Sequence, residues 1–461
     1  MNICVVNGSP RGKYSITLQT ILYLKAKFKE HKFDIMNIGQ QIRIIEKDEK
    51  ALEEIIARLK NADLIIFSYP VYTFIAPSQL HRFVELIKAS ETDLSGKYVT
   101  QITTSKHFYD ITAHRYIEEN CHDMKMKVIH GLSADMDDLL EKRGQEDAQN
   151  FFNYVIYCTE NDIYEAPPKC NNEVNNEAFF PEREGDLINN WGKTEKSSKY
   201  DVAIVADIDD DDHNLKDMIS WFRKIFPYAT RIVNIAEYPF KGGCLGCFNC
   251  AGDGKCVYKD GFDEFLRGNI QKADAVVYGF SIKDHSMGAR FKMYDDRQFC
   301  NGHRTVTEGM PFGYIVNGDL PEEENLRTII EGRCEVGHNF LSGVGYSEKT
   351  LRAMSKRLTY ALQNHYLQPR NFYGVGGMKI FRDLIWLMRG LMKADHRYYK
   401  EHGVYDDFPQ RHRIKMIKMS LLGALVRNPK VKAKMGNKMN EGMVAPYKKI
   451  LDEAEKQQSP K

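Results

Sequence analysis

The stretch NICVVNGSPRGKYSIT, residues 2–17, decides the fold, because a short apolar strand runs into a Gly-Ser-Pro loop that opens a helix. Four more apolar stretches follow in the first half, separated by amphipathic segments of about helix length. They are FDIMNIG at 33–39, ADLIIFSY at 62–69, KYVTQITTS at 97–105 and MKVIHGLS at 126–133. This alternation predicts an α/β fold with a doubly wound parallel sheet.

A second alternation of the same kind begins at Tyr200. Its apolar stretches are YDVAIVADI at 200–208, TRIVNIAEY at 230–238, ADAVVYGFSI at 273–282, MPFGYIVNG at 310–318 and NFLSGVGYS at 339–347. The repeated order of elements indicates a weak internal duplication. We therefore expect two α/β domains, at 1–160 and 199–347.

Two segments lie outside this alternation. Residues 161–198 are rich in Asn, Glu and Pro and are typical of a linker or excursion. Residues 348–461 are Met-rich and basic, with apolar residues at helical spacing, as in KIFRDLIWLMRGLMK at 379–393. They predict a C-terminal helical extension that covers a sheet face or a dimer surface, with a basic membrane-surface helix as the alternative.

The composition excludes several classes of protein. The 461 residues include 65 basic and 63 acidic side chains, so the net charge of +2 gives no nucleic-acid signature. The N-terminus predicts no signal peptide, and no uncharged run reaches the roughly 18 to 20 apolar residues of a membrane helix. We expect a cytoplasmic protein, in which ten cysteines favour metal or redox chemistry over disulfides.

Four cysteines are concentrated in CLGCFNCAGDGKC, residues 244–256. Two CxxC steps in series bring three thiolates together from one loop, and the Gly-rich spacer returns the chain to deliver a fourth. Thiolate-only ligation suits a 4Fe-4S cluster or zinc, and reactive thiols are the third alternative. The predicted ligands are Cys244, Cys247, Cys250 and Cys256, of which Cys256 is the least secure because no proline follows it.

The loop GSPRGKYSIT, residues 8–17, presents backbone N–H groups and hydroxyls at the start of a helix, and Arg11 adds a positive charge. It therefore predicts an anion site. The alternative is an ordinary helix cap with a Pro turn.

The loop also resembles that of the flavodoxin-like NAD(P)H-dependent FMN reductases, as do SYPVYTFIAPSQLHRFVE at 68–85 and LSGKYVTQITTS at 94–105. The resemblance implies an FMN site beyond the carboxyl ends of the strands. The FMN phosphate would lie on Ser9, Arg11, Ser15 and Thr17. Pro70, Val71, Tyr72 and Thr73 would line the isoalloxazine ring, and Thr103, Thr104 and Ser105 would touch its edge. For Tyr72, a buried core aromatic is the alternative.

The second half keeps the fold and differs at the cofactor loop. That loop is ADIDDDDHN, residues 206–214, which should repel a phosphate. GARFKMYDDRQF at 288–299 resembles a helix of the same flavoproteins, and the cysteine run lies in the connection where iron–sulfur flavoproteins carry theirs. We therefore expect two flavodoxin-like doubly wound parallel five-stranded sheets in tandem, with one FMN and one cluster per chain, as an internal pseudo-dimer or a homodimer.

The resemblance implies an FMN- and iron–sulfur-dependent oxidoreductase. It would move electrons between NAD(P)H or ferredoxin and an unidentified small-molecule or protein acceptor. The alternatives are a non-catalytic electron carrier or redox sensor, and a zinc-stapled interaction protein. His107, His285 and His303 lie near loops that could face a flavin, whereas Cys300 and Cys334 are expected to be buried small hydrophobes.

Overall fold

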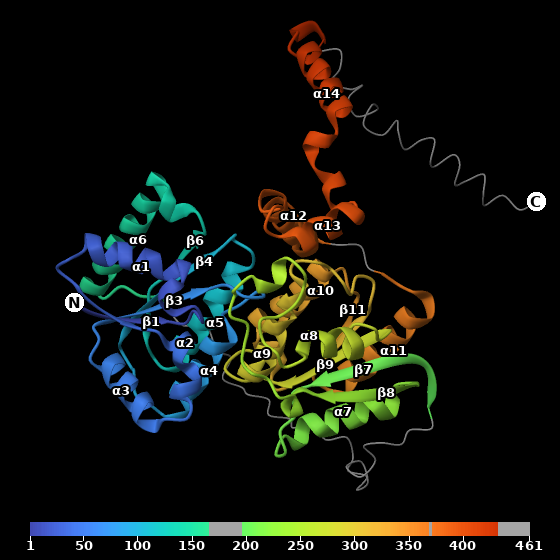
Figure 1. Ribbon diagram of the computed structural model, residues 1–461, viewed down its shortest axis with the longest axis horizontal. Coiled ribbons are helices and arrows are strands. Elements are labelled where there is room, and N and C mark those ends of the chain that lie inside the picture. The colour runs from blue at the N-terminus through green and yellow to red at the C-terminus, as the bar shows by residue number, and fades with distance from the viewer. Residues whose placement is uncertain (166–195, 368–370, 432–461) are drawn as a thin grey trace, which may run out of the picture. The chain divides into compact units, whose positions relative to one another are not determined.

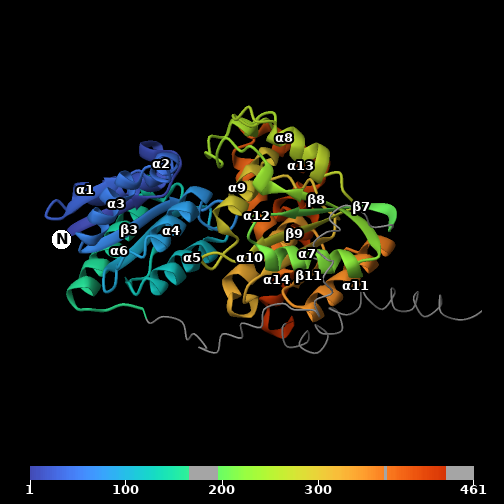
Figure 2. The ribbon, with the colours of Figure 1, turned by 90° about the horizontal axis from the view of Figure 1, so that it is seen from below.

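The computed structural model describes residues 1–165, 196–367 and 371–431. Its contacts divide the chain into two compact units, Met1–Arg397 and Tyr398–Lys461. The first unit holds two separate parallel sheets, drawn from blue to teal and from green to orange (Figures 1 and 2). The predicted linker at 161–198 lies largely outside the described residues.

The first sheet has the order β2-β1-β3-β4-β5, and β6 also pairs with β4. Every pairing is parallel, so the predicted doubly wound α/β topology is confirmed. The strands are β1 (Asn2–Asn7), β2 (Lys32–Met36), β3 (Leu64–Pro70), β4 (Tyr98–Ser105), β5 (Lys127–Val128) and β6 (Leu132–Asp135).

The sheet thus has six strands where five were predicted. The expected strand at 126–133 is interrupted between β5 and β6, where the Thr100 hydroxyl donates to the His130 carbonyl. Gly131 lies there against the side chains of Gln101 and His114, so that a Cβ would come within 2.4 Å of Gln101. Side-chain packing therefore replaces the backbone ladder at this point.

Helices cover both faces of the first sheet (Figure 1). Helices α1 and α6 share an apolar core with it, in which Ile21, Leu24 and Phe152 are fully buried. The other helices of this half lie on the opposite face of the sheet, some of them toward the second half of the chain (Figure 1). Their bounds are α1 (Ile16–Lys27), α2 (Ile38–Ile45), α3 (Glu49–Lys60), α4 (Ser78–Ala89), α5 (Asp110–Asp123) and α6 (Lys142–Glu160).

The second sheet has the order β8-β7-β9-β10-β11, which repeats the 2-1-3-4-5 order of the first, and its five parallel strands were predicted. The strands are β7 (Ser197–Ala206), β8 (Tyr228–Asn234), β9 (Ala275–Ser281), β10 (Phe312–Asn317) and β11 (Leu341–Gly345). The same order in both halves supports the internal duplication.

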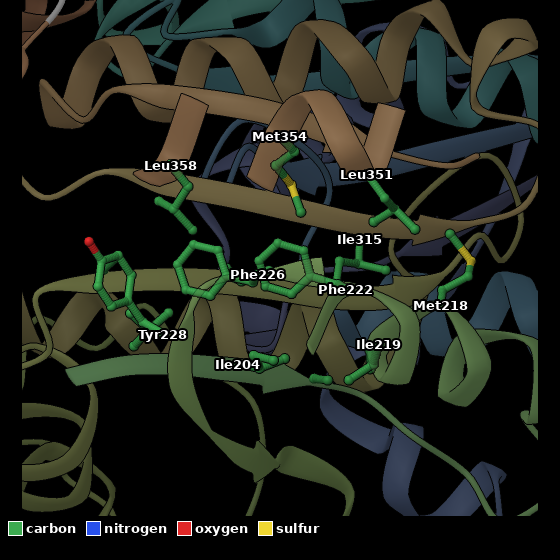
Figure 3. Close-up of a cluster of buried hydrophobic side chains, with 14 of the residues drawn as sticks. Ile204, Met218, Ile219, Phe222, Phe226, Tyr228, Ile315, Leu351, Met354 and Leu358 are labelled. Carbon is green, nitrogen blue, oxygen red and sulfur yellow. The ribbon is translucent and has the colours of Figure 1, made fainter. Parts of the chain in front are cut away.

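Helices α7 (His213–Ile225) and α11 (Glu348–Asn364) close one face of this sheet (Figure 3). Leu351, Met354 and Leu358 of α11 point toward Phe222 and Phe226, and all five side chains are fully buried. Helix α11 begins the predicted C-terminal extension, which was expected to cover a sheet face or a dimer surface. It covers the second sheet, because a parallel sheet must be buried on both faces.

The remaining helices belong to the second half and to the C-terminal segment. They are α8 (Phe262–Phe265), α9 (Gly288–Arg297), α10 (Glu324–Gly337), α12 (Phe372–Leu387), α13 (Lys393–Glu401) and α14 (Arg413–Val426). Within the described ranges, none of the helices combines the length and apolar character needed to cross a bilayer.

The two halves meet through α4 and α9, and the contact is reciprocal. The Asp296 carboxylate of α9 accepts from the Ser78 N–H at 2.9 Å, where α4 begins. The Glu85 carboxylate of α4 accepts from the Ala289 N–H at 2.7 Å, where α9 begins. Such an exchange is what a two-fold interface between equal subunits produces.

Candidate functional site

One cavity of about 390 Å³ is lined by both halves of the chain. It contains ten of the eleven predicted flavin residues and all four predicted metal ligands. They are Ser9, Arg11, Ser15, Thr17, Pro70, Val71, Tyr72, Thr73, Thr104, Ser105, Cys244, Cys247, Cys250 and Cys256. Folding therefore brings together two groups of residues that lie more than a hundred positions apart in the sequence.

Thr103 is the predicted flavin residue that does not line the cavity. Its side chain is buried, and its hydroxyl lies 2.8 Å from Nε2 of His114. Side chains alternate along a strand, so Thr104 points to the cavity and Thr103 to the opposite face.

The loop between β1 and α1 has the features of a phosphate site. The Ser15 hydroxyl caps α1 by accepting from the Leu18 N–H, and the first residues of the helix, Ile16 and Thr17, line the cavity. The buried hydroxyls of Thr17 and Thr104 have no hydrogen-bond partner among the described residues. A ligand with acceptor oxygens would satisfy both, so these residues fit the FMN that the sequence implies.

The loop after β3 is held in an uncommon backbone conformation. Tyr72 and Ile75 pair across a tight turn, and the two residues between them, Thr73 and Phe74, have φ angles of 46° and 72°. Such strain persists only where the surroundings hold it, and it is common at ligand sites. Burial, followed by the charge of nearby Cys244, raises the pKa of Tyr72 well above its ordinary value, so its phenol stays neutral.

The cysteine loop lies directly against this turn. Gly246 has a φ of 61°, and a Cβ there would lie 1.8 Å from the Tyr72 hydroxyl. The amide of Gln79, at the start of α4, donates to the Cys244 carbonyl at 3.3 Å. Glycine is required at position 246 both for the left-handed turn and for this close approach. The cysteines of the second half are thereby set beside the flavin residues of the first.

The four thiols are not drawn together around one point in this structure. Among the described residues, no three of their sulfur atoms lie within 4.8 Å of one another. Four sulfurs at about 2.3 Å from a tetrahedral zinc would be roughly 3.8 Å apart. Burial raises the pKa of Cys250 to about 11 and that of Cys244 further. Four thiol donors are the ligand type that an iron–sulfur core takes, and binding of such a core would displace the thiol protons.

A buried ion pair of α9 contacts the turn at Tyr72. The Lys292 ammonium and the Asp296 carboxylate, both 0% exposed, lie 2.5 Å apart, and Lys292 also donates to the Tyr72 carbonyl at 2.9 Å. On the same helix, Arg297 forms two hydrogen bonds to Asp260 and donates to the Gly242 carbonyl, next to the cysteine run. Helix α9 therefore holds both loops of the cavity.

The acidic loop of the second half, residues 206–214, pairs with an arginine of helix α9. Arg290 of α9 bonds to Asp207 at 2.5 Å and to Asp209 at 2.7 Å. Burial acts to raise the pKa of Asp209, but the hydrogen bond from Arg290 outweighs it and the pKa is lowered. The loop lacks an arginine of its own, as predicted, and two of its five carboxylates, Asp207 and Asp209, pair with Arg290 of α9.

The cavity also contains residues that the sequence analysis did not assign to a site. They are Phe299, Cys300 and Arg304 after α9, Arg333 of α10, Phe381 of α12, and Met392 and Asp395 next to and within α13. Cys300 is buried, as expected, but it borders the cavity. The sequence gives one signal for the helical part: aromatic and Met residues at helical spacing in 379–393, which can line a pocket as well as a core.

The three histidines that were expected near the flavin differ in their position relative to the cavity. His107 pairs with Asp110, and His285 pairs with Asp123 and Glu323; neither lines the cavity. His303 lines it, beside the cysteine loop.

A doubly wound sheet of order 2-1-3-4-5 with an anion loop after its first strand defines a flavodoxin-like protein. A sequence model of the NADPH-dependent FMN reductases matches residues 1–135, which confirms the predicted resemblance over that part of the chain. An iron–sulfur flavoprotein of Clostridioides difficile strain 630 is 35% identical over 54 residues, which make up 12% of this chain and 24% of that protein. The chain thus spans about a quarter of this curated relative.

Solved structures are similar at low identity. An FMN-dependent NADH-azoreductase from Bacillus anthracis is 14% identical with a TM-score of 0.27, covering 35% of this chain and 99% of that one. An NAD(P)H:quinone oxidoreductase from Methanothermobacter marburgensis is 11% identical with a TM-score of 0.28, covering 37% and 99%. Each covers little more than a third of this chain, and the fold assignment rests on the strand order itself.

Proposed function

We propose that the protein is an FMN- and iron–sulfur-dependent oxidoreductase that moves electrons between NAD(P)H and an acceptor. One observation carries the proposal: the predicted flavin residues of the first half and the four cysteines of the second half line the same cavity. Electron transfer requires the two cofactors to be close, and this arrangement supports such proximity within one chain.

The chain's own residues would hold FMN at two points. Ser9, Arg11, Ser15 and Thr17 would bind its phosphate at the N-terminus of α1, where the helix dipole favours an anion. The turn at Tyr72 and Thr73, with Thr104, would position the ring. When bound, FMN supplies hydride acceptance and one-electron release, and the protein contributes orientation and electrostatics.

The four cysteines would hold a 4Fe-4S cluster. The wide spacing of their sulfurs supports a cluster over zinc, and the close approach of the cysteine loop to Tyr72 supports transfer between cluster and ring. The proposed partners are a reduced donor, either NAD(P)H or ferredoxin, and a small-molecule or protein acceptor. In this proposal the internal pseudo-dimer supplies a complete site without a second chain.

Anaerobic stopped-flow spectroscopy tests the proposal. Protein loaded with FMN and iron should show flavin bleaching on mixing with NADH or NADPH, followed by loss of the broad cluster absorption. The expected result is bleaching at rates of at least about 1 s⁻¹, within the usual range for enzymes. A protein that binds both cofactors, but is reduced only by ferredoxin and passes single electrons onward, would be an electron carrier instead.

A further inference from the structure

A second cluster of side chains that can ligate a metal lies where the two halves of the chain meet. It consists of Glu119 of α5, His285 in the loop between β9 and α9, and Glu323, the residue before α10. One possible ligand atom from each of the three lies within 4.8 Å of the other two. None of the three residues lines the cavity described above. The cluster is therefore distinct from the proposed flavin and cysteine site.

The His285 imidazole is held at both of its ring nitrogens. Nδ1 lies 3.0 Å from Oε1 of Glu323, and Nε2 lies 2.9 Å from Oδ2 of Asp123. Asp284 and His285 have φ angles of 50° and 61°, a left-handed conformation that persists in such residues only where the surroundings hold it. The ring is thus fixed in position and in orientation.

The contact at Nε2 is the one that metal-bound histidines commonly make. A histidine that ligates a metal through one ring nitrogen donates its other N–H to a carboxylate, which fixes the tautomer and strengthens the ligand. Asp123 takes this outer position, and it is held there by the Lys88 ammonium at 2.6 Å. Nδ1, on the side of Glu323, is then the nitrogen available to a metal. A metal ion would take the place of the proton at Nδ1, which is released to solvent.

Glu119 provides an independent observation that points to a cation. Its Oε2 atom is buried and has no hydrogen-bond partner among the described residues. A buried carboxylate oxygen without a donor is costly and calls for a partner. The imidazole does not supply one, because both of its nitrogens already face Glu323 and Asp123. A cation between Glu119, Glu323 and Nδ1 of His285 would satisfy this oxygen.

We propose that Glu119, Glu323 and Nδ1 of His285 bind a divalent metal ion of the Mn²⁺ kind, with Asp123 orienting the imidazole from outside. Two carboxylates and one imidazole form a hard oxygen and nitrogen donor set, which suits Mn²⁺ and differs from the thiolates of the cysteine run. Glu119 belongs to the first half of the chain, and the other two ligands belong to the second. The metal would therefore join the halves and stabilise the folded state to which it binds.

Electron paramagnetic resonance tests the site, because free Mn²⁺ gives a sharp signal that is lost on binding. The full chain, loaded with FMN and iron and freed of other metals, is titrated with MnCl₂. The wild type should bind one Mn²⁺ per chain that Glu119→Gln does not. The variant's Kd should rise at least about 100-fold, since loss of an outer partner alone costs 10- to 100-fold. The matched control is Glu118→Gln, at a neighbouring glutamate that accepts from Gln101, which should bind Mn²⁺ as the wild type does.

Thermal unfolding gives a second readout that is independent of flavin and cluster chemistry. Glu119→Gln should fold, because Oε2 of Glu119 accepts no hydrogen bond from the described residues. Without metal, its melting temperature should equal or exceed that of the wild type. Mn²⁺ should raise the melting temperature of the wild type and of Glu118→Gln and leave that of Glu119→Gln unchanged. Absence of Mn²⁺ binding to the wild type, or an equal response of wild type and Glu119→Gln, would overturn the inference.

Discussion

Thr17 lines the cavity from the first turn of α1, and its buried hydroxyl has no hydrogen-bond partner among the described residues. We expect Thr17→Val to have opposite effects on folding and binding. Removing an unsatisfied buried hydroxyl should stabilise the FMN-free protein by about 1 kcal/mol, while loss of a contact to FMN should weaken its binding roughly 10-fold. Urea unfolding and fluorescence titration measure the two effects.

The control for this variant is Thr20→Val, one turn along the same helix, buried but outside the cavity. It should leave FMN affinity unchanged. If Thr17→Val binds FMN as tightly as the wild type, the phosphate assignment at this loop is wrong.

Cys247 is the exposed member of the cysteine run, so its replacement disturbs packing least. Serine is a poor ligand for an iron–sulfur cluster. Cys247→Ser should therefore lose the broad visible absorption and most of the iron while FMN stays bound. Cys121→Ala, at a buried cysteine away from the cavity, should keep both cofactors. Anaerobic protein with stoichiometric zinc and no iron would contradict the cluster.

At the scale of elements, α9 carries the fully buried pair of Lys292 and Asp296. Lys292→Met leaves the Asp296 carboxylate without its cation, and breaking a buried pair in this way costs about 3–5 kcal/mol of unfolding free energy. The double variant Lys292→Met/Asp296→Asn should recover part of that loss, since asparagine is neutral and still accepts from the Ser78 N–H. Denaturant unfolding of both variants measures these free energies. A loss below about 1 kcal/mol in the single variant would refute the stabilising role of the buried pair.

The contact between the halves also includes His285, which bonds to Asp123 at 2.9 Å and to Glu323 at 3.0 Å. Burial lowers the pKa of His285, but these two carboxylates outweigh it and raise the pKa to about 10, from an ordinary value of 6.5. A raised pKa means that the native state binds the proton more tightly than the unfolded state. The stabilisation is therefore complete below pH 6.5 and is lost as the pH rises toward 10.

His285→Gln should remove this pH dependence. We expect the wild-type melting temperature to fall between pH 6.5 and 10 more steeply than that of the variant, with the two curves converging at high pH. His130→Gln, at an exposed histidine, serves as the control. Parallel curves for wild type and His285→Gln would show that the pair does not stabilise the contact.

At the scale of the whole molecule, the two halves have the same strand order and different cofactor loops. The second loop offers carboxylates where a phosphate would need donors, and the Arg290 side chain is already engaged by Asp207 and Asp209. We expect one FMN and about four iron atoms per chain. Quantitative FMN release against protein and iron concentration checks the count, and two FMN per chain would refute the division between the halves.

Local pattern was sufficient to predict most elements and to propose a chemistry for two loops. Strand periodicity located all ten apolar stretches, because a buried parallel strand must be continuously apolar, and turn and helix-start residues identified the Gly8 to Thr17 loop. The cysteine spacing predicted a metal site in the same way. Each of these signals depends on residues close together in the sequence.

What the sequence could not decide depends on contacts between distant residues. The shared cavity, the reciprocal contact of α4 with α9, and the pairing of Arg290 with the acidic loop all join segments that are far apart in the chain. The orientation of Thr103 and the place of α11 on the second sheet were decided by which face had to be buried. Glu119 and His285 are 166 positions apart, and only tertiary packing brings that carboxylate and the imidazole into one cluster.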